Sequence, residues 1–111
     1  MRASYLQSGA SLYYYNLSWL DQGGVTFNDV RGLVGASDPS LAEPGSLRGS
    51  LMAAWQKYGL PQQPNQRDNC LHASTSSLDA LAERFCWLCP KWPLSQDPLA
   101  ARLVAVQVIS F

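Results

Sequence analysis

Charge and cysteine are both scarce in this chain of 111 residues. Eight Lys and Arg side chains balance eight Asp and Glu side chains, so no net field of the whole molecule would attract nucleic acid or an anionic membrane. Three cysteines are too few, and odd in number, for a disulfide scaffold, which favours a reducing compartment. We therefore expect a cytoplasmic protein without nucleic-acid or membrane partners.

Long apolar runs are missing as well. No segment approaches the roughly 18 apolar residues of a membrane span, and the N-terminus lacks a charged start followed by a signal-type apolar segment. The length suits one small domain over residues 1–111. Yet 47% of the residues are hydrophobic and only 14% are charged. This composition predicts that a partner or further chain covers part of the apolar surface.

The first half of the chain predicts a strand and a helix. An aromatic-rich run within residues 10–17, bounded by glycine-containing turns, favours a strand. Apolar residues then recur at helical spacing from Phe27 to Gly35. Thr26 is the predicted N-cap of this helix, and Gly35 is its predicted stop.

The middle of the chain is richer in turn residues. The two prolines within residues 37–45 predict an irregular loop. The later half of residues 47–58 has the apolar spacing of a helix, which Gly59 would end. Residues 61–67 read as an insertion loop.

The clearest helix signal begins near Ser76. Ser76 and Asp79 have the spacing of a capping box, and an apolar stripe at helical spacing follows them. That stripe consists of Leu78, Leu81, Ala82, Phe85 and Leu88. Residues 89–111 form a predicted C-terminal extension, in which residues 99–108 suit a helix or a strand equally.

The only histidine, His72, lies just before that helix. A largely neutral imidazole at pH 7 can be a nucleophile, a base or a metal ligand. Because free backbone N–H groups at a helix start favour phosphate, His72 is a candidate to face a phosphoryl group. Glu83 would then accept the second imidazole N–H and leave the other nitrogen free to attack. The alternative is a loop histidine beside capping hydroxyls, with Glu83 in solvent.

Cysteines near His72 allow a different chemistry. One imidazole and three thiolates could complete a tetrahedral zinc site. An apolar neighbourhood around Cys86 instead favours a buried, inert thiol. The zinc set would be Cys70, His72, Cys86 and Cys89.

Arginines flank the central region at positions 31, 48 and 67. Their planar guanidinium groups could clamp phosphate oxygens from separate elements. Spacing alone equally allows three solvated surface arginines.

Two blocks of sequence, in order, resemble the nucleoside diphosphate kinase family. The first block, residues 31–49, reads RGLVGASDP and then, after four residues, PGSLRG; it is similar to the family's Arg-x-x-x-Gly-x-Thr-x-Pro … Pro-Gly-Thr-Ile-Arg-Gly. The second block, residues 69–76, reads NCLHASTS and is similar to Asn-x-x-His-Gly-Ser-Asp-Ser. Glu83 stands at the family's glutamate position.

This resemblance implies an α/β (α+β) fold, with part of a ferredoxin-like antiparallel sheet and flanking helices. It also implies transfer of the γ-phosphoryl from a nucleoside triphosphate to a nucleoside diphosphate through a phosphohistidine on His72, oriented by Glu83. The nucleotide would bring Mg²⁺, and a homo-oligomer would be the expected assembly. Residues implied to bind the nucleotide or its phosphates are Arg31, Ser37, Arg48, Asn69 and Ser74.

The chain departs from the family pattern at several points. Ala73 and Thr75 stand where the family has glycine and aspartate, and no Lys-Pro-Asp strand motif is present. The resemblance spans residues 5–88, without about the first third of the family fold, so a fragment or divergent form is expected. A non-catalytic nucleotide-binding or protein-interaction remnant of the family is therefore the alternative function, and a small zinc-binding module is the third.

Overall fold

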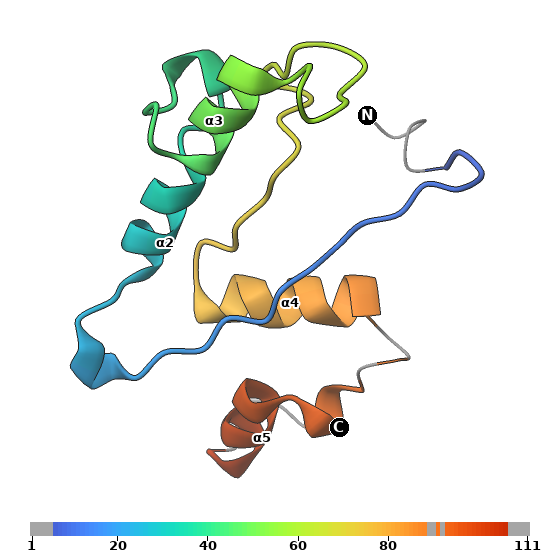
Figure 1. The fold of residues 1–111 in the computed structure, drawn as a ribbon. Helices are drawn as coiled ribbons and strands as arrows, with labels where there is room; N and C mark the ends of the chain where they lie inside the picture. Colours follow the sequence, from blue (N-terminus) through green and yellow to red (C-terminus); the bar gives the residue numbers. More distant parts are fainter. Residues whose placement is uncertain (1–5, 89–90, 92, 107–111) are drawn as a thin grey trace. The chain divides into compact units, whose positions relative to one another are not determined.

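The computed structural model describes residues 6–88, 91 and 93–106, and the regular structure within them is helical (Figure 1). Their β-type pairing is limited to an isolated bridge between Asn65 and Asp68. The α-helices are α2 (Phe27–Val34), α3 (Leu47–Ala54), α4 (Ser77–Leu88) and α5 (Pro98–Ala105). Short 3-10 helices precede three of them: η1 (Asp21–Gly23), η2 (Pro39–Leu41) and η3 (Leu94–Gln96).

The predicted ferredoxin-like antiparallel sheet is wrong, since the described ranges contain no sheet. Residues 10–17 run without regular structure, and Tyr13 is 91% exposed. A strand is stable only when neighbouring strands pair with its backbone and a layer covers its apolar face. The aromatic run finds neither in the described chain, so β-propensity alone does not make it a strand.

The chain divides into two compact units, residues 1–73 and 74–111, and each is described by itself. The single domain over residues 1–111 stays a prediction. Within the predicted C-terminal extension, residues 89–90, 92 and 107–111 lie outside the described residues.

Helix α2 of the first unit confirms the prediction for residues 27–35. Thr26 and Asp29 form a reciprocal capping box: each side chain accepts a hydrogen bond from the other residue's backbone N–H. Gly35 ends the helix with a φ of 95°, a conformation that glycine adopts without a Cβ penalty. The ring of Phe27 meets that of Trp19 edge-on, with 5.0 Å between centroids.

Helix α3 occupies the early part of residues 47–58, so the prediction of a helix in the later half is wrong. Ser46 caps the helix by accepting a hydrogen bond from Gly49 N at 3.1 Å, and its hydroxyl donates to Glu43 O at 2.7 Å. The N-cap therefore starts the helix earlier than its apolar pattern suggests. Turns follow, and Gly59 has a φ of 71°.

The predicted loops are largely irregular. Residues 37–45 include the short η2, whose N-cap Asp38 accepts hydrogen bonds from the backbone and hydroxyl of Ser40. In residues 61–67 the Asn65 side chain accepts from the backbone N–H of Arg67 and of Asp68. This local turn holds the loop without any regular element.

Helix α4 of the second unit confirms the predicted helix near Ser76. The backbone N–H of Asp79 donates to Ser76 Oγ at 3.1 Å, and the hydroxyl groups of Thr75 and Ser76 donate to the Asp79 carboxylate. The buried apolar residues of the unit are Leu81 and Ala100 within its described part.

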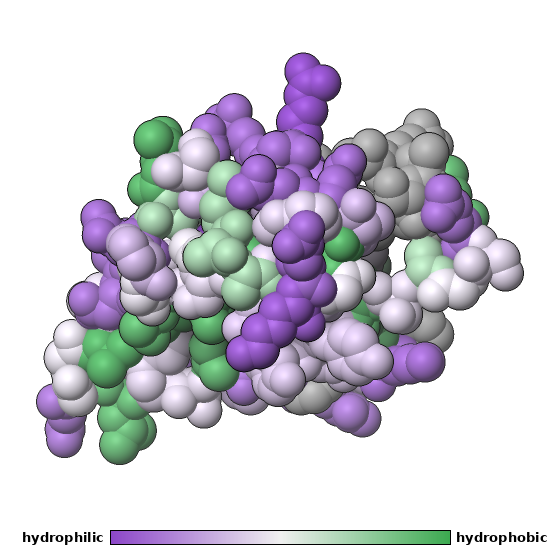
Figure 2. Space-filling view, turned by 45° about the horizontal axis from the view of Figure 1, so that its top comes forward, coloured by the Kyte–Doolittle hydropathy of each residue, from purple (hydrophilic) through white to green (hydrophobic). Residues whose placement is uncertain are grey.

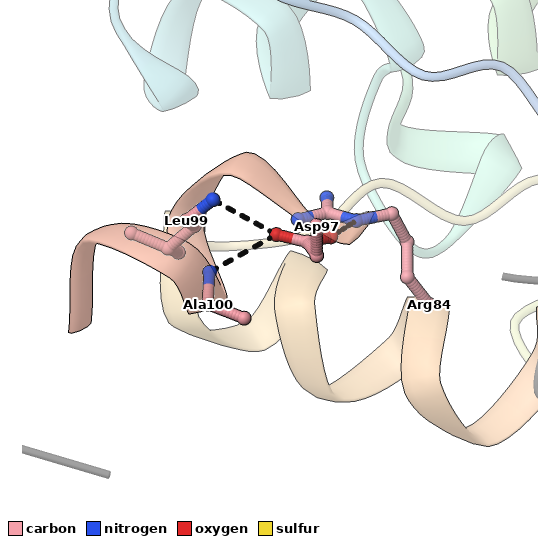
Figure 3. A network of polar contacts seen from close by, with 4 residues as sticks. All are labelled: Arg84, Asp97, Leu99 and Ala100. Carbon is pink, nitrogen blue, oxygen red and sulfur yellow. Dashed lines mark hydrogen bonds and ion pairs between the residues drawn. The ribbon is translucent and has the colours of Figure 1, made fainter. Parts of the chain in front are cut away.

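Helix α5 begins at an Asp-Pro pair and resolves the ambiguity at residues 99–108 as helix up to Ala105. Asp97 caps it, accepting from Leu99 N at 2.9 Å and Ala100 N at 3.3 Å (Figure 3). The same carboxylate pairs with Arg84 Nε of α4 at 2.6 Å. A side chain that is 1% exposed thus ties α5 to α4.

Many large hydrophobic side chains remain at the surface, where Figure 2 shows them in green among hydrophilic residues. They include Leu12, Leu33, Leu47 and Phe85. None of the helices in the described ranges is long and apolar enough to cross a membrane.

Candidate functional site

Arg48 joins the two sequence blocks that carry the resemblance. Its guanidinium donates from Nη1 to Gly35 O at 2.6 Å and from Nη2 to Leu71 O at 2.5 Å. Hydrogen bonds from a charged donor are among the strongest that a side chain makes. The start of α3 is thereby fastened to the end of α2 and to the residue before His72.

Asn69 adds a second link between the same two blocks. Its Nδ2 donates to Ser37 O at 3.0 Å. The structure therefore holds the segments of Ser37, Arg48 and Asn69 to one another in the first unit, and their contacts with a nucleotide stay a prediction. Arg48 and Asn69 donate to backbone carbonyl groups, and Ser37 contributes one of these carbonyls.

Two glycines allow these segments to approach closely. A Cβ at Gly35 would collide with the Ser46 side chain, and a Cβ at Gly49 would collide with the carbonyl of Glu43. Glycine is the residue that permits such backbone contacts. The glycines of the first block thus fit the packing of α3 against the loop before it.

Positive charge gathers at this junction. Burial lowers the pKa of Arg48, and the like charge of Arg31 lowers it further. Arg31 lies exposed in the last turn of α2, whereas Arg48 is 7% exposed. Arg48 Nε is buried and has no hydrogen-bond partner in the described part of the chain. Of these two arginines, Arg31 is the one open to a ligand.

His72 is exposed at the end of the first unit, and Glu83 belongs to the second. Their pairing therefore stays a prediction. Ser74 donates its hydroxyl hydrogen bond to Glu83 Oε2 at 2.6 Å.

The first turn of α4 already contains an anion. The hydroxyl groups of Thr75 and then Ser76 lower the pKa of Asp79, which keeps this carboxylate charged. Because a carboxylate there interacts favourably with the helix dipole, it competes with any phosphate at the same end.

The four predicted zinc ligands are divided between the units. Cys70 and His72 lie in the first, Cys86 lies in the second, and Cys89 lies outside the described residues. No cluster of three or more His, Cys, Asp or Glu residues suited to a metal ion occurs among the residues that the structure describes. Burial and the nearby charge of Asp68 raise the pKa of Cys70, which disfavours its thiolate.

Sequence reasoning missed the carbonyl groups of Gly35 and Leu71 as partners of Arg48. The signal that could have found the first of them is the pair of glycines Gly35 and Gly49 in the first block, because glycine marks close backbone approach. Nothing in the sequence singles out Leu71.

No protein-family model, curated protein or solved structure matches this chain significantly. The resemblance to nucleoside diphosphate kinases therefore rests on residues 31–49, residues 69–76 and Glu83.

Proposed function

We propose that the chain is a phosphotransferase of the nucleoside diphosphate kinase type, which carries a phosphoryl group on His72. The observation that supports it is the pair of hydrogen bonds from Arg48 to Gly35 O and Leu71 O. These bonds hold the arginine-bearing block against the residue that precedes the histidine. A phosphate accepted by His72 would then lie close to fixed positive charge.

The proposed reaction has two balanced halves. An imidazole nitrogen of neutral His72 attacks the γ-phosphorus, and the bond from that phosphorus to the bridging oxygen breaks. The nucleoside diphosphate leaves with the bond's electron pair. A terminal oxygen of a second diphosphate then attacks the phosphohistidine, and the P–N electron pair returns to the imidazole.

The supporting side chains suit a transfer in which charge spreads over the phosphoryl oxygens. Such a reaction is accelerated mainly by positioning and by fixed positive groups. Arg31 and Arg48 would supply the charge, and the exposed hydroxyl of Ser37 is available as a donor. Mg²⁺ would enter with the nucleotide as part of the substrate.

The test is incubation with MgATP labelled at the γ-phosphorus. We expect acid-labile label on the protein, because phosphoramidate bonds hydrolyse in acid, and we expect transfer of that label to added GDP. The single histidine makes the assignment direct. His72→Ala should abolish the label, whereas Gln66→Ala, at an exposed position of the preceding loop, should keep it. Label that persists in His72→Ala would refute the proposal.

A non-catalytic nucleotide-binding protein is the second candidate. The observation that favours it is the burial of Arg48, whose Nη1 and Nη2 each already donate to a backbone carbonyl. This leaves fewer donors for a transferring phosphoryl group. Calorimetric binding of ADP by a chain that neither retains nor transfers the label would select this candidate.

A further inference from the structure

We propose that Arg48 is a positioning residue, whose hydrogen bond to the Leu71 carbonyl holds the backbone that leads into His72. Asn69 holds the same segment through its hydrogen bond to Ser37 O, and these two hydrogen bonds are called the braces below. This inference rests on the proposed function and assigns Arg48 a different part in it from direct phosphate binding. The geometry that carries it lies wholly within the first unit.

The two braces flank a residue in a rare backbone conformation. Asn69 is held through its side chain at Ser37 O, and Leu71 is held through its carbonyl by Arg48. Between them, Cys70 has a φ of 66°, in the left-handed region. A non-glycine residue there is strained and persists only when its surroundings enforce the conformation. The two hydrogen bonds provide that enforcement on both sides.

The direction of the chain at His72 therefore depends on the braces. His72 follows Leu71 directly, and its own side chain is exposed. Releasing the Leu71 carbonyl would let Cys70 relax toward an ordinary extended conformation. The imidazole would then sample orientations that are unsuited to in-line attack.

The state of the guanidinium argues against a clamp on the nucleotide. Arg48 is buried, and its two terminal nitrogens point to carbonyl oxygens on separate segments. Each bond is a part-buried, charge-assisted hydrogen bond, so it resists exchange for a ligand. Arg31, which is exposed, is the residue of this pair that suits direct contact with phosphate.

Positioning and binding roles predict different kinetics. A misplacement of about 1 Å at the reacting group can lower the rate about 100-fold while ground-state binding is kept. Loss of a phosphate contact made equally in the bound and transition states raises KM instead. The proposal therefore expects Arg48 to affect kcat.

The first arm of the test measures phosphoryl transfer by Arg48→Met, Arg48→Lys and the control Lys57→Met, which alters an exposed cation beyond α3. Arg48→Met should lower kcat about 100-fold with KM for ATP within about twofold. Arg48→Lys can donate to one of the two carbonyls and should recover part of kcat, and Lys57→Met should match the parent chain. A raised KM with kcat preserved would overturn the inference.

The second arm needs no activity and uses backbone ¹⁵N order parameters at Leu71 and His72. We expect values near 0.85 in the parent chain and below about 0.6 in Arg48→Met, with a smaller fall in Asn69→Ala. Signals of α2 and α3 that stay dispersed show that the variant is folded. If Arg48→Met unfolds, Asn69→Ala decides this arm.

Order parameters that do not fall in the deciding variant would overturn the inference. A parent chain that shows ordered residues 71 and 72 but forms no phosphohistidine would refute the proposed function. It would leave intact the finding that Arg48 and Asn69 hold this segment. The two failures are therefore distinguishable.

Discussion

The two units bury different kinds of side chain. In the described part of the first unit, the buried residues are small, polar or charged: Pro39, Ser46, Arg48, Gly49 and Pro64. The second unit buries Leu81 of α4 and Ala100 of α5, together with the Asp97 carboxylate that pairs with Arg84. One unit is braced by hydrogen bonds to backbone carbonyls, and the other by helix packing around an ion pair.

This difference explains which unit can hold its backbone segments in fixed directions. Apolar packing is non-directional and tolerates small shifts of one helix on another. Charge-assisted hydrogen bonds to carbonyl groups instead fix the direction of the segments that they join. The first unit therefore orders its irregular segments without an aliphatic core, and it is this unit that carries His72.

Asp97→Ala should give the largest change, because it removes the buried partner of Arg84 and the N-cap of α5 together. Breaking a buried ion pair costs about 3–5 kcal/mol. Urea unfolding followed by helical circular dichroism would measure the loss. Asp97→Asn is the control: it keeps an N-cap acceptor and removes the charge, so it should lose less. A loss below about 1 kcal/mol in Asp97→Ala would show that the ion pair does not hold this unit.

Gly49→Ala should give the next largest change, in the first unit. The added Cβ would collide with the Glu43 carbonyl, which is backbone and cannot move aside cheaply. We expect a loss of about 1–3 kcal/mol in the free energy of unfolding. Gly45→Ala is the matched control, since nothing lies within 4 Å of its Cβ position, and it should change stability by about 0.5 kcal/mol or less. Equal unfolding curves for the two variants would contradict the close approach.

Low pH should reduce the stability of the second unit, because it protonates the Asp97 carboxylate. Burial raises the pKa of this carboxyl, but hydrogen bonds from Arg84, Ala100 and Leu99 outweigh burial, so its pKa lies below the ordinary 3.8. A lowered folded-state pKa contributes stability that is complete above the unfolded value and is lost as pH falls through the folded value. The stability difference between the parent chain and Asp97→Asn should therefore shrink as pH drops below 3.8. A difference that stays constant through this range would exclude the linkage.

Thr26→Ala should give the smallest change. It removes one half of the exposed capping box at α2, which is worth about 1 kcal/mol. Thr26→Ser retains the hydroxyl and should stay within a few tenths of a kcal/mol of the parent chain. Urea unfolding of the two variants measures the difference, and an effect as large as that of Gly49→Ala would contradict this order.

The nucleotide-binding roles of Ser37, Arg48 and Asn69 stay predictions. The structure links the two sequence blocks that contain them through the hydrogen bonds of Arg48 and Asn69 in the first unit. Their hydrogen-bond partners were not predictable, because Gly35 and Leu71 contribute main-chain carbonyls that every residue possesses. Whether His72 pairs with Glu83 remains a prediction.

The order of residues alone sets the bounds of α2 and the start of α4. Each N-cap pairs with a residue three positions further on, and Gly35 ends α2. The sequence was a poor guide to features that depend on contacts between residues far apart in the chain. Residues 10–17 have strand propensity but no strand beside them among the described residues, and the sequence does not indicate that Arg48 donates to carbonyls 13 and 23 residues away. Local hydrogen bonds follow from the order of residues, whereas sheet pairing and the partners of a buried charge depend on which segments the folded chain brings together.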